Sequence, residues 1–339
     1  MYYLHFDPSI CSPNIGDQII SQAVESILST LLPDLGSIKF PTQYSSLIRS
    51  HRILESSQIN IVGGTNLITP NRLKFSQWKI PISFYIKNYK FLLLGVGIHQ
   101  YKNKFDPLSS FAYRRLLRSK YLHSVRDSYT QRTLESLKIS SINTSCPTLW
   151  PLIDDASQAK IPTVKSASVV FTLTDYRKSP VNDIKLIQTL ISIYSNVYFW
   201  PQGTGDQIYC TELLSSIGKT SSVSFLPFGL TSYTDLLRCS QLDYVGTRLH
   251  AGIYALNHFK RSLVLSVDNR AAEIGKDINL PVIARDEINS ISNFIQTPSP
   301  LRLQLPTSNV VNWCTRLRLD MGLDTPSSSM LNFNYSSSL

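Results

Sequence analysis

Arg248 and His250 are the two residues of this 339-residue chain whose types and spacing point most clearly to chemistry. They lie in Val245-Gly246-Thr247-Arg248-Leu249-His250-Ala251-Gly252, where we expect a strand to end at Gly246 and a helix to begin near His250. In an extended segment, Arg248 and His250 project to one side while Leu249 anchors the other. The start of a helix adds partial positive charge, so this turn could hold an anion on Arg248 beside a titratable imidazole.

A second arginine, Arg126, lies in Ser124-Val125-Arg126-Asp127-Ser128, where a strand is expected to turn into the helix Thr130–Leu137. Arg126 would then emerge at the carboxyl end of a strand, which is where open α/β sheets bind ligands. The structural alternative is a salt bridge with Asp127, although adjacent residues of a strand point to opposite faces. We favour a ligand-binding role.

Glycine-rich turns supply weaker candidates. Gly63-Gly64-Thr65-Asn66 and Gly95-Val96-Gly97-Ile98-His99 each follow a buried strand, where glycine permits positive φ and exposes backbone N–H groups to an anion. Neither matches a GxGxxG or Walker fingerprint.

Two polar turns complete the set of candidates. In Asn14-Ile15-Gly16-Asp17, before an amphipathic helix, Asn14 suits an N-cap and Asp17 suits the helix dipole. Helix capping and ligand binding both remain open for this turn. Gln202 and Asp206, in a turn that begins at Trp200, follow a strand and could bind hydroxyl groups, whereas Trp200 is expected in the core.

Alternating strands and helices are expected to position these residues. The predicted strands are Tyr2–Phe6, Ile59–Val62, Phe91–Val96, Leu122–Arg126, a weaker one near Ile142, Val169–Leu173, Val197–Trp200, Val223–Leu226, Tyr244–Val245 and Leu263–Val267. The predicted helices are Ile19–Leu31, with an apolar stripe of helical period, Thr130–Leu137, Ile184–Ile193, Ile208–Ile217, Ala251–Leu256 and Val310–Leu319. This order predicts an α/β fold with two doubly wound Rossmann-like domains that face a cleft.

The domain boundaries follow from composition. We expect a basic N-terminal domain over residues 1–160, a second domain over 161–305, and a C-terminal helix with a Ser-rich tail over 306–339. The polar, proline-bearing stretch Asp154–Ser168 is the expected linker, and the Ser-rich end after Pro326 is expected to be disordered.

The composition excludes several classes of protein. Hydrophobic residues make up 42% of the chain, which rules out a disordered tail, a collagen and a coiled coil. The formal net charge of +10 reflects a shortage of acids, and between Arg72 and Lys120 eleven basic residues accompany one acid, Asp106. Such a surplus attracts nucleic acid, anionic lipid or phosphorylated small molecules, but no RNP-like motif is present, so no nucleic-acid partner is expected.

Cysteine usage and the chain start give expectations about location. The five cysteines are odd in number and form no CxxC pair, and no histidine lies at metal-ligand spacing, so we expect reduced thiols, no disulfides and no metal site. The N-terminus resembles no signal peptide, and the longest apolar stretch, Phe91 to Ile98, is far shorter than the ~20 residues of a membrane span. A cytoplasmic protein is expected.

The motifs together resemble the polysaccharide pyruvyl transferase family. The order Asn-x-Gly-Asp, Gly-Gly, Gly-x-Gly, Val-Arg-Asp-Ser and Gly-Thr-Arg-Leu-His-Ala carries the resemblance, which extends roughly from Asn14 to Pro281 and includes Val267-Asp268-Asn269-Arg270. It implies a GT-B-like fold and transfer of the pyruvyl unit of phosphoenolpyruvate to a sugar, usually as a ketal. No cofactor is expected.

The resemblance also implies roles for individual residues. Arg248 and Arg126 match arginines that hold the phosphate and carboxylate of the donor, and His250 matches the proposed acid/base residue. We place Leu249 beside them in the donor site. The candidates on the acceptor side are Asn14, Asp17, Gly64, Thr65, Gln202, Asp206 and Arg270.

Two departures from the family pattern concern the acceptor. Many members have Pro-Asp where this chain has Cys146-Pro147-Thr148, which removes a carboxylate, and Thr65 replaces the third glycine of a frequent Gly-Gly-Gly. The acceptor is a sugar or a lipid-linked glycan, and the basic segment 72–120 is expected to face it peripherally at the inner membrane surface. The alternatives are a GT-B nucleotide-sugar glycosyltransferase, in which Asp206 or Asp268 would bind ribose, a basic non-enzymatic binding module, and an inactive family member.

Overall fold

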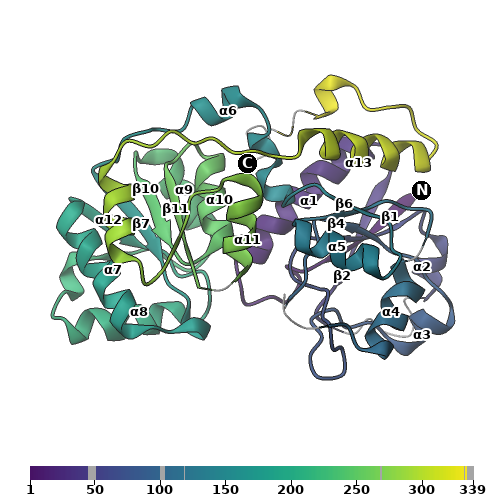
Figure 1. The fold of residues 1–339 in the computed structure, drawn as a ribbon, viewed down its shortest axis with the longest axis horizontal. Helices are drawn as coiled ribbons and strands as arrows, with labels where there is room; N and C mark the ends of the chain where they lie inside the picture. Colours follow the sequence, from purple (N-terminus) through teal and green to yellow (C-terminus); the bar gives the residue numbers. More distant parts are fainter. Residues whose placement is uncertain (45–50, 100–103, 118, 268, 332, 334–339) are drawn as a thin grey trace. The chain divides into compact units, whose positions relative to one another are not determined.

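The chain folds into two compact α/β units (Figure 1). The computed structural model describes residues 1–44, 51–99, 104–117, 119–267, 269–331 and 333. Unit 1 comprises Met1–Ser12, Ile20–Pro151 and Leu305–Leu339, and unit 2 comprises Pro13–Ile19 and Leu152–Gln304. Every strand pairing that the structure describes is parallel, which confirms the predicted fold class.

Unit 1 contains a four-stranded sheet in the order β2-β1-β3-β4 and a two-stranded sheet, β5-β6. The strands are β1 (Tyr2–Asp7), β2 (Gly36–Pro41), β3 (Asn60–Gly63), β4 (Leu92–Leu94), β5 (His123–Val125) and β6 (Ser141–Asn143). The helices are α1 (Gly16–Leu31), whose first residues belong to unit 2, α2 (His51–Ser56), α3 (Ile82–Ile86), α4 (Pro107–Leu117), α5 (Ser128–Ser136), α13 (Thr307–Asp320) and the 3-10 helices η2 (Pro147–Leu152) and η5 (Ser328–Leu331). The strand order reverses beside β1: the chain adds β2 on one side of β1 and then β3 and β4 on the other. Open parallel sheets bind ligands at such a reversal point, so the expected ligand-binding position is at the carboxyl ends of β1 and β3.

Unit 2 contains a six-stranded sheet in the order β12-β11-β10-β7-β8-β9. The strands are β7 (Ser168–Thr172), β8 (Asn196–Phe199), β9 (Ser224–Phe225), β10 (Asp243–Gly246), β11 (Ser262–Ser266) and β12 (Val282–Ala284). The helices are α6 (Asp155–Ala159), α7 (Pro180–Ile193), α8 (Asp206–Ser216), α9 (Leu230–Cys239), α10 (Leu249–Asn257), α11 (Asn269–Ile278), α12 (Ile288–Gln296) and the 3-10 helices η3 (Asp175–Arg177) and η4 (Thr220–Ser222). The reversal point here lies between β7 and β10, so the turns that follow these two strands occupy the expected ligand-binding edge.

The amphipathic helix α1 matches its predicted stripe. Ile20, Val24, Ile27, Leu28 and Leu31 are all fully buried. Apolar residues that recur at helical spacing align on one face, and burial of that face stabilises the helix against the sheet of unit 1.

Strand β2 was missing from the sequence prediction. Its first four residues are exposed, and it forms the edge of the sheet with no apolar alternation, so only pairing with β1 defines it. The expected linker Asp154–Ser168 is also partly wrong, because Asp154 caps helix α6 through a hydrogen bond from the Ser157 N–H to its side chain (2.7 Å). The units divide after Pro151, nine residues before the predicted boundary at 160.

The C-terminal segment belongs to unit 1 instead of standing apart. The predicted helix is present as α13, where Trp313 donates to the Leu122 carbonyl (2.9 Å) and Asn309 donates to the Asn143 carbonyl (2.8 Å). The expectation of disorder after Pro326 is wrong for η5 and for Phe333, which is buried against Trp150 with ring centroids 5.0 Å apart. Residues 332 and 334–339 lie outside the described part of the chain.

Two buried histidines in unit 1 predict that the protein loses stability in acid. His123 is neutral in the fold, because its Nδ1 accepts from the Leu93 N–H (3.2 Å) and its Nε2 donates to the Leu117 carbonyl (2.7 Å). For His5, no described residue provides a hydrogen-bond partner to either ring nitrogen. Burial lowers the pKa of each histidine to about 4.

We therefore expect the unfolding free energy to be highest above pH ~6.5, where unfolded histidine is also neutral, and to fall towards pH 4 as the unfolded state takes up protons. Each histidine contributes up to about 1.4 kcal/mol per pH unit within this window. Urea denaturation across the window measures the slope, and His5→Leu, which removes one titrating group, should flatten it. An unfolding free energy that is independent of pH in both proteins would contradict the argument.

Candidate active site

The reversal point of the unit 2 sheet holds the buried guanidinium of Arg248. This residue follows β10 and is 4% exposed. Its Nη2 donates to the carboxylates of Asp206 (2.5 Å) and Asp175 (3.4 Å), and its Nε donates to the Leu173 carbonyl (3.2 Å). The Arg248 side chain is therefore held in one orientation before any ligand binds.

Asp206 positions Arg248 and does not present a free carboxylate. Its Oδ2 accepts from the N–H groups of Gln202 (3.2 Å) and Gly203 (2.7 Å), and its Oδ1 accepts from the Asp175 N–H (3.0 Å) as well as from Arg248. An ionised carboxylate offers about four acceptor positions, so these contacts fill it. Burial raises the pKa of the Asp206 carboxyl, and the Arg248 guanidinium counteracts this effect. The predicted contact between Asp206 and an acceptor hydroxyl does not fit this geometry.

Two turns that are far apart in sequence meet beside this ion pair. Asn14 accepts from the Gly16 N–H (3.2 Å) and from the Gln202 side-chain amide (2.8 Å), while the Ile15 N–H donates to the Gln202 carbonyl (3.0 Å). A methyl group on Gly16 would lie 2.5 Å from the Gln202 amide nitrogen, so this approach requires glycine. Asn14, Gln202, Asp206 and Arg248 thus form one polar network within unit 2.

Gln202 brings to this network an acceptor atom for which the described part of the chain provides no donor. The side chain is 3% exposed, and no described residue donates a hydrogen bond to its buried Oε1. Because a buried acceptor without a donor is costly, a ligand hydroxyl or a water molecule is the expected partner.

His250 lies in a different local structure from the one that the sequence predicted. Helix α10 begins at Leu249, so His250 is the second helical residue and only Arg248 keeps an extended conformation (φ −101°, ψ 103°). The predicted same-side projection from a strand is therefore wrong for His250. Leu249 packs against the core of unit 2. Arg248 is the N-cap residue of α10, and its side chain does not cap the N–H groups of the first turn. These N–H groups and the imidazole of His250 therefore lie at the same helix terminus, where an anion can bind.

The other predicted residues of this half are placed as follows. Asp17 is the second residue of α1 and is buried. Arg270 falls in the first turn of α11, and its side chain lies outside the part that the structure describes, as does Asp268.

In unit 1 the two glycine turns meet each other, and the second lies against Arg126. Gly64 (φ +56°) and Thr65 (φ +53°) follow β3, and the Thr65 carbonyl accepts from the Gly97 N–H (2.9 Å). A methyl group on Gly97 would overlap the Arg126 guanidinium, which is 3% exposed.

Arg126 also forms a salt bridge with Asp127, which is the structural alternative to a ligand-binding role. Its Nε lies 3.4 Å from Asp127 Oδ2, and Asp127 caps α5 by accepting from the Thr130 N–H (2.7 Å). Both residues lie beyond the end of β5, so strand alternation does not separate them. Cys146 and Thr148, where the family pattern differs, are both buried, and the Cys146 Sγ lies 3.1 Å from the Thr148 Oγ1. Burial raises the pKa of the Cys146 thiol, and the hydrogen bonds with Thr148 and the charge of Arg126 offset this effect only in part.

Substitution of Gly97 by alanine tests Arg126 without removing it. The added methyl group should displace the guanidinium and, under the hypothesis from the motifs that Arg126 binds phosphoenolpyruvate, weaken that binding by up to about 100-fold, the scale of a 1 Å misplacement. Titration with phosphoenolpyruvate measures the effect. Gly36→Ala is the matched control, because its methyl group would meet no atom closer than 3.8 Å. Equal affinity in both variants would remove Arg126 from the donor site.

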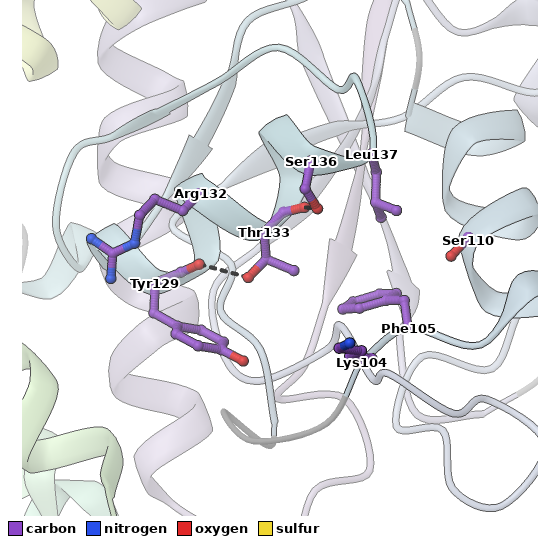
Figure 2. Close-up of a pocket in the computed structure, with 8 residues that line it drawn as sticks. All are labelled: Lys104, Phe105, Ser110, Tyr129, Arg132, Thr133, Ser136 and Leu137. Atoms are coloured by element: carbon purple, nitrogen blue, oxygen red, sulfur yellow. Dashed lines mark hydrogen bonds between the residues drawn. The ribbon is translucent and has the colours of Figure 1, made fainter.

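A pocket of about 460 Å³ lies beside α5 in unit 1 (Figure 2). It is lined by Lys104, Phe105, Ser110, Tyr129, Arg132, Thr133, Ser136 and Leu137. Aromatic rings, hydroxyl groups and two cations surround the space, and none of its lining side chains is acidic. The sequence prediction missed this site, although Tyr129, Arg132, Thr133 and Ser136 recur at the spacing of one helix face.

One group of side chains in unit 1 has the chemistry of metal ligands. Potential ligand atoms of His5, Asp7 and Glu25 all lie within 4.8 Å of one another. The Lys39 ammonium contacts both carboxylates, at 3.3 Å from Asp7, so the protein already provides a cation here.

Comparison with known proteins agrees with the motif order. A family model described as polysaccharide pyruvyl transferase matches residues 14–269. No curated protein matches the sequence. None of the helices in the described ranges is both long enough and apolar enough to cross a bilayer.

Several solved structures resemble this chain at low sequence identity. The UDP-GlcNAc 2-epimerase of Methanocaldococcus jannaschii is 9% identical with a TM-score of 0.51, covering 90% of this chain and 94% of the epimerase. That of Neisseria meningitidis is 11% identical with a TM-score of 0.44, covering 87% and 90%. The lipopolysaccharide outer core galactosyltransferase WaaB is 7% identical with a TM-score of 0.47, covering 87% and 88%. The similarity to the Methanocaldococcus jannaschii epimerase supports a GT-B type fold. At 9% identity it shows the fold alone.

Proposed function

Since the chain belongs to the polysaccharide pyruvyl transferase family, we propose that it transfers the pyruvyl unit of phosphoenolpyruvate to two hydroxyl groups of a sugar, forming a ketal. The observation that carries this proposal within the site is the buried, pre-oriented Arg248 at the reversal point of the unit 2 sheet, directly before the helix terminus that bears His250.

Phosphoenolpyruvate suits this terminus because it is compact and carries a phosphate and a carboxylate. Guanidinium groups bind both anions in a bidentate way, and the N–H groups of a helix terminus bind phosphate. Asp206 compensates much of the Arg248 charge, so α10 and a further cation must contribute to holding the donor. Arg126 of unit 1 stays a candidate for binding the donor anion on the family resemblance, and Leu249 supports the turn in unit 2.

His250 is the proposed proton donor and acceptor. The imidazolium protonates the methylene carbon of the enolpyruvyl group, which leaves an oxocarbenium-like C2. A sugar hydroxyl attacks C2 and gives its proton back to the imidazole, and the C2–O bond to phosphate then breaks. A second hydroxyl attacks C2, and its proton leaves with the phosphate. The sum is one ketal and one inorganic phosphate.

For the acceptor we propose candidate residues in each unit, taken separately. In unit 2, the free Oε1 of Gln202 can accept from a hydroxyl, with Asn14 fixing the amide and Asp17 nearby in sequence. In unit 1, the pocket beside α5 offers rings, hydroxyls and cations, which suits an acidic saccharide, and Gly64 and Thr65 supply backbone groups at the carboxyl edge of β3. Arg270 remains a candidate from the sequence alone.

The decisive assay is incubation with labelled phosphoenolpyruvate and a panel of acceptor glycans. Phosphate release together with an acid-labile, labelled glycan supports the proposal. Phosphate release without labelled glycan, or no turnover with any acceptor, counts against it.

A nucleotide-sugar glycosyltransferase is the alternative on the same fold, and it needs a carboxylate for ribose. Asp206 has its acceptor positions filled, which argues against this residue as the ribose ligand, while Asp268 lies outside the described residues. Thermal shift with phosphoenolpyruvate against UDP- and GDP-sugars separates the two functions, because stabilisation follows the ligand that the folded state binds.

A further inference from the structure

Unit 1 exposes an unusual set of large apolar side chains over residues 73–111. Their exposed fractions are 82% for Leu73, 77% for Ile82, 74% for Ile86, 62% for Phe111, 51% for Leu108 and 45% for Phe75. We call these six residues the α3–α4 surface. Single exposed apolar residues are ordinary, but several on neighbouring elements mark an interaction site.

The elements that carry these side chains are packed together. The Arg72 N–H donates to Ser109 of α4 (2.9 Å), and its guanidinium lies over the rings of Tyr85 in α3 (6.0 Å) and Tyr113 in α4 (5.3 Å). Arg115 of α4 donates to the Tyr85 carbonyl (3.1 Å). Helices α3 and α4 consequently lie side by side, with the 73–75 loop attached through Arg72 (Figure 1).

Spacing places the apolar side chains on exposed faces. Ile82 and Ile86 are four residues apart on α3, and Leu108 and Phe111 are three residues apart on α4. Residues at these spacings are neighbours on a helix surface, so each helix presents a pair to solvent.

The charge around this surface is predominantly positive. Lys74, Lys79, Arg114 and Arg115 are exposed between and beside the apolar residues. Asp106 is the sole acid from residue 72 to 117, and its carboxylate accepts from the Ser109 N–H (2.8 Å) and hydroxyl (2.7 Å). Lys87 pairs with Glu55, while the described contacts of the other four include no acidic side chain. Interfaces with proteins are depleted in lysine at their core, whereas apolar side chains among cations suit an anionic lipid surface.

We propose that the α3–α4 surface docks on an anionic lipid bilayer, inserting its six apolar side chains at the boundary of headgroups and acyl chains while the lysines and arginines contact lipid phosphates. Apolar insertion and electrostatic attraction together provide the two signals that stable peripheral binding requires.

The same helix connects this surface to the pocket beside α5. Ser110 lines the pocket and lies between Leu108 and Phe111 in α4. Docking through α4 would therefore bring the pocket close to the membrane, which suits a lipid-linked acceptor; this step rests on the proposed function.

Flotation with vesicles tests the docking directly. Wild-type protein should bind vesicles of phosphatidylcholine with phosphatidylglycerol, and bind pure phosphatidylcholine much less. The double variant Ile82→Ser with Ile86→Ser should partition onto the vesicles roughly tenfold less or weaker still, because it loses carbon atoms that the bilayer would bury. Val181→Ser with Ile208→Ser is the matched control, since these residues of unit 2 are 67% and 64% exposed. Lys74→Glu with Lys79→Glu should give a loss that depends on salt.

Three results would overturn the proposal: no binding of wild-type protein to anionic vesicles, unchanged binding of the Ile82/Ile86 variant, or an equal loss in the Val181/Ile208 control. An assay of ketal formation on a water-soluble glycan distinguishes the docking proposal from the proposed function, because it needs no membrane. The Ile82/Ile86 variant should retain that activity, whereas vesicle binding without any ketal product would support docking and reject the proposed function.

Discussion

Replacement of His250 by alanine is expected to lower turnover by roughly 10²- to 10⁴-fold, the usual contribution of a general acid/base residue. The side chain is half-buried at the second position of α10 and is not part of the unit 2 core, so the fold should persist. Affinity for phosphoenolpyruvate should change little, because Arg248 and the helix terminus remain. The loss should therefore appear in kcat and not in donor binding.

His258→Asn provides the matched control on the same helix. His258 lies at the C-terminal end of α10, where its ring contacts the Tyr254 carbonyl (2.9 Å), so its loss should leave kcat near the wild-type value. Steady-state kinetics and circular dichroism of the three proteins separate a chemical defect from a folding defect. A wild-type rate in His250→Ala would end its assignment as the acid/base residue.

Replacement of Arg248 by alanine is expected to act on stability and on binding at once. It leaves the Asp206 carboxylate fully buried without its cation, and removal of one partner of a buried pair costs about 3–5 kcal/mol. Donor binding should weaken as well, because the proposed contact with the phosphoenolpyruvate anion is lost.

A double variant separates these two effects. Arg248→Ala combined with Asp206→Asn removes the uncompensated charge and should recover a large part of the unfolding free energy, while affinity for phosphoenolpyruvate stays low. Arg248→Lys should also bind poorly, since lysine keeps the charge but lacks the planar fork. Urea denaturation and ligand titration measure the two quantities.

Arg261 is the control for a purely structural pair. It is 4% exposed, lies 3.8 Å from buried Asp243, and donates to the carbonyls of Ile295 and Thr297. Arg261→Ala should destabilise unit 2 without changing donor affinity in the folded protein. If the Arg248/Asp206 double variant binds phosphoenolpyruvate like the wild type, Arg248 is structural and the donor site must lie elsewhere.

The sequence by itself determined the fold class, most strands and the family, but fewer than half of the described α-helices. Each of these depends on local information: the stripe of α1 repeats every three or four residues, and Asn14, Gly64 and Arg248 are recognised by their immediate neighbours. Elements with a weak local pattern were not predicted. The exposed edge strand β2 is an example, because only its pairing with β1 defines it.

Only the tertiary structure decided which of the candidate residues contact one another. Asn14 meets Gln202 across 188 positions of sequence, and Asp206 meets Arg248 across 42. The Asp206–Arg248 pair depends on strand order, because a parallel sheet brings the turns after β7, β8 and β10 to one edge whatever their distance along the chain. The Asn14–Gln202 pair depends on the packing of the segment before α1 against the turn after β8. For the same reason Asp206, which the sequence presented as a free carboxylate, is the fixed partner of Arg248.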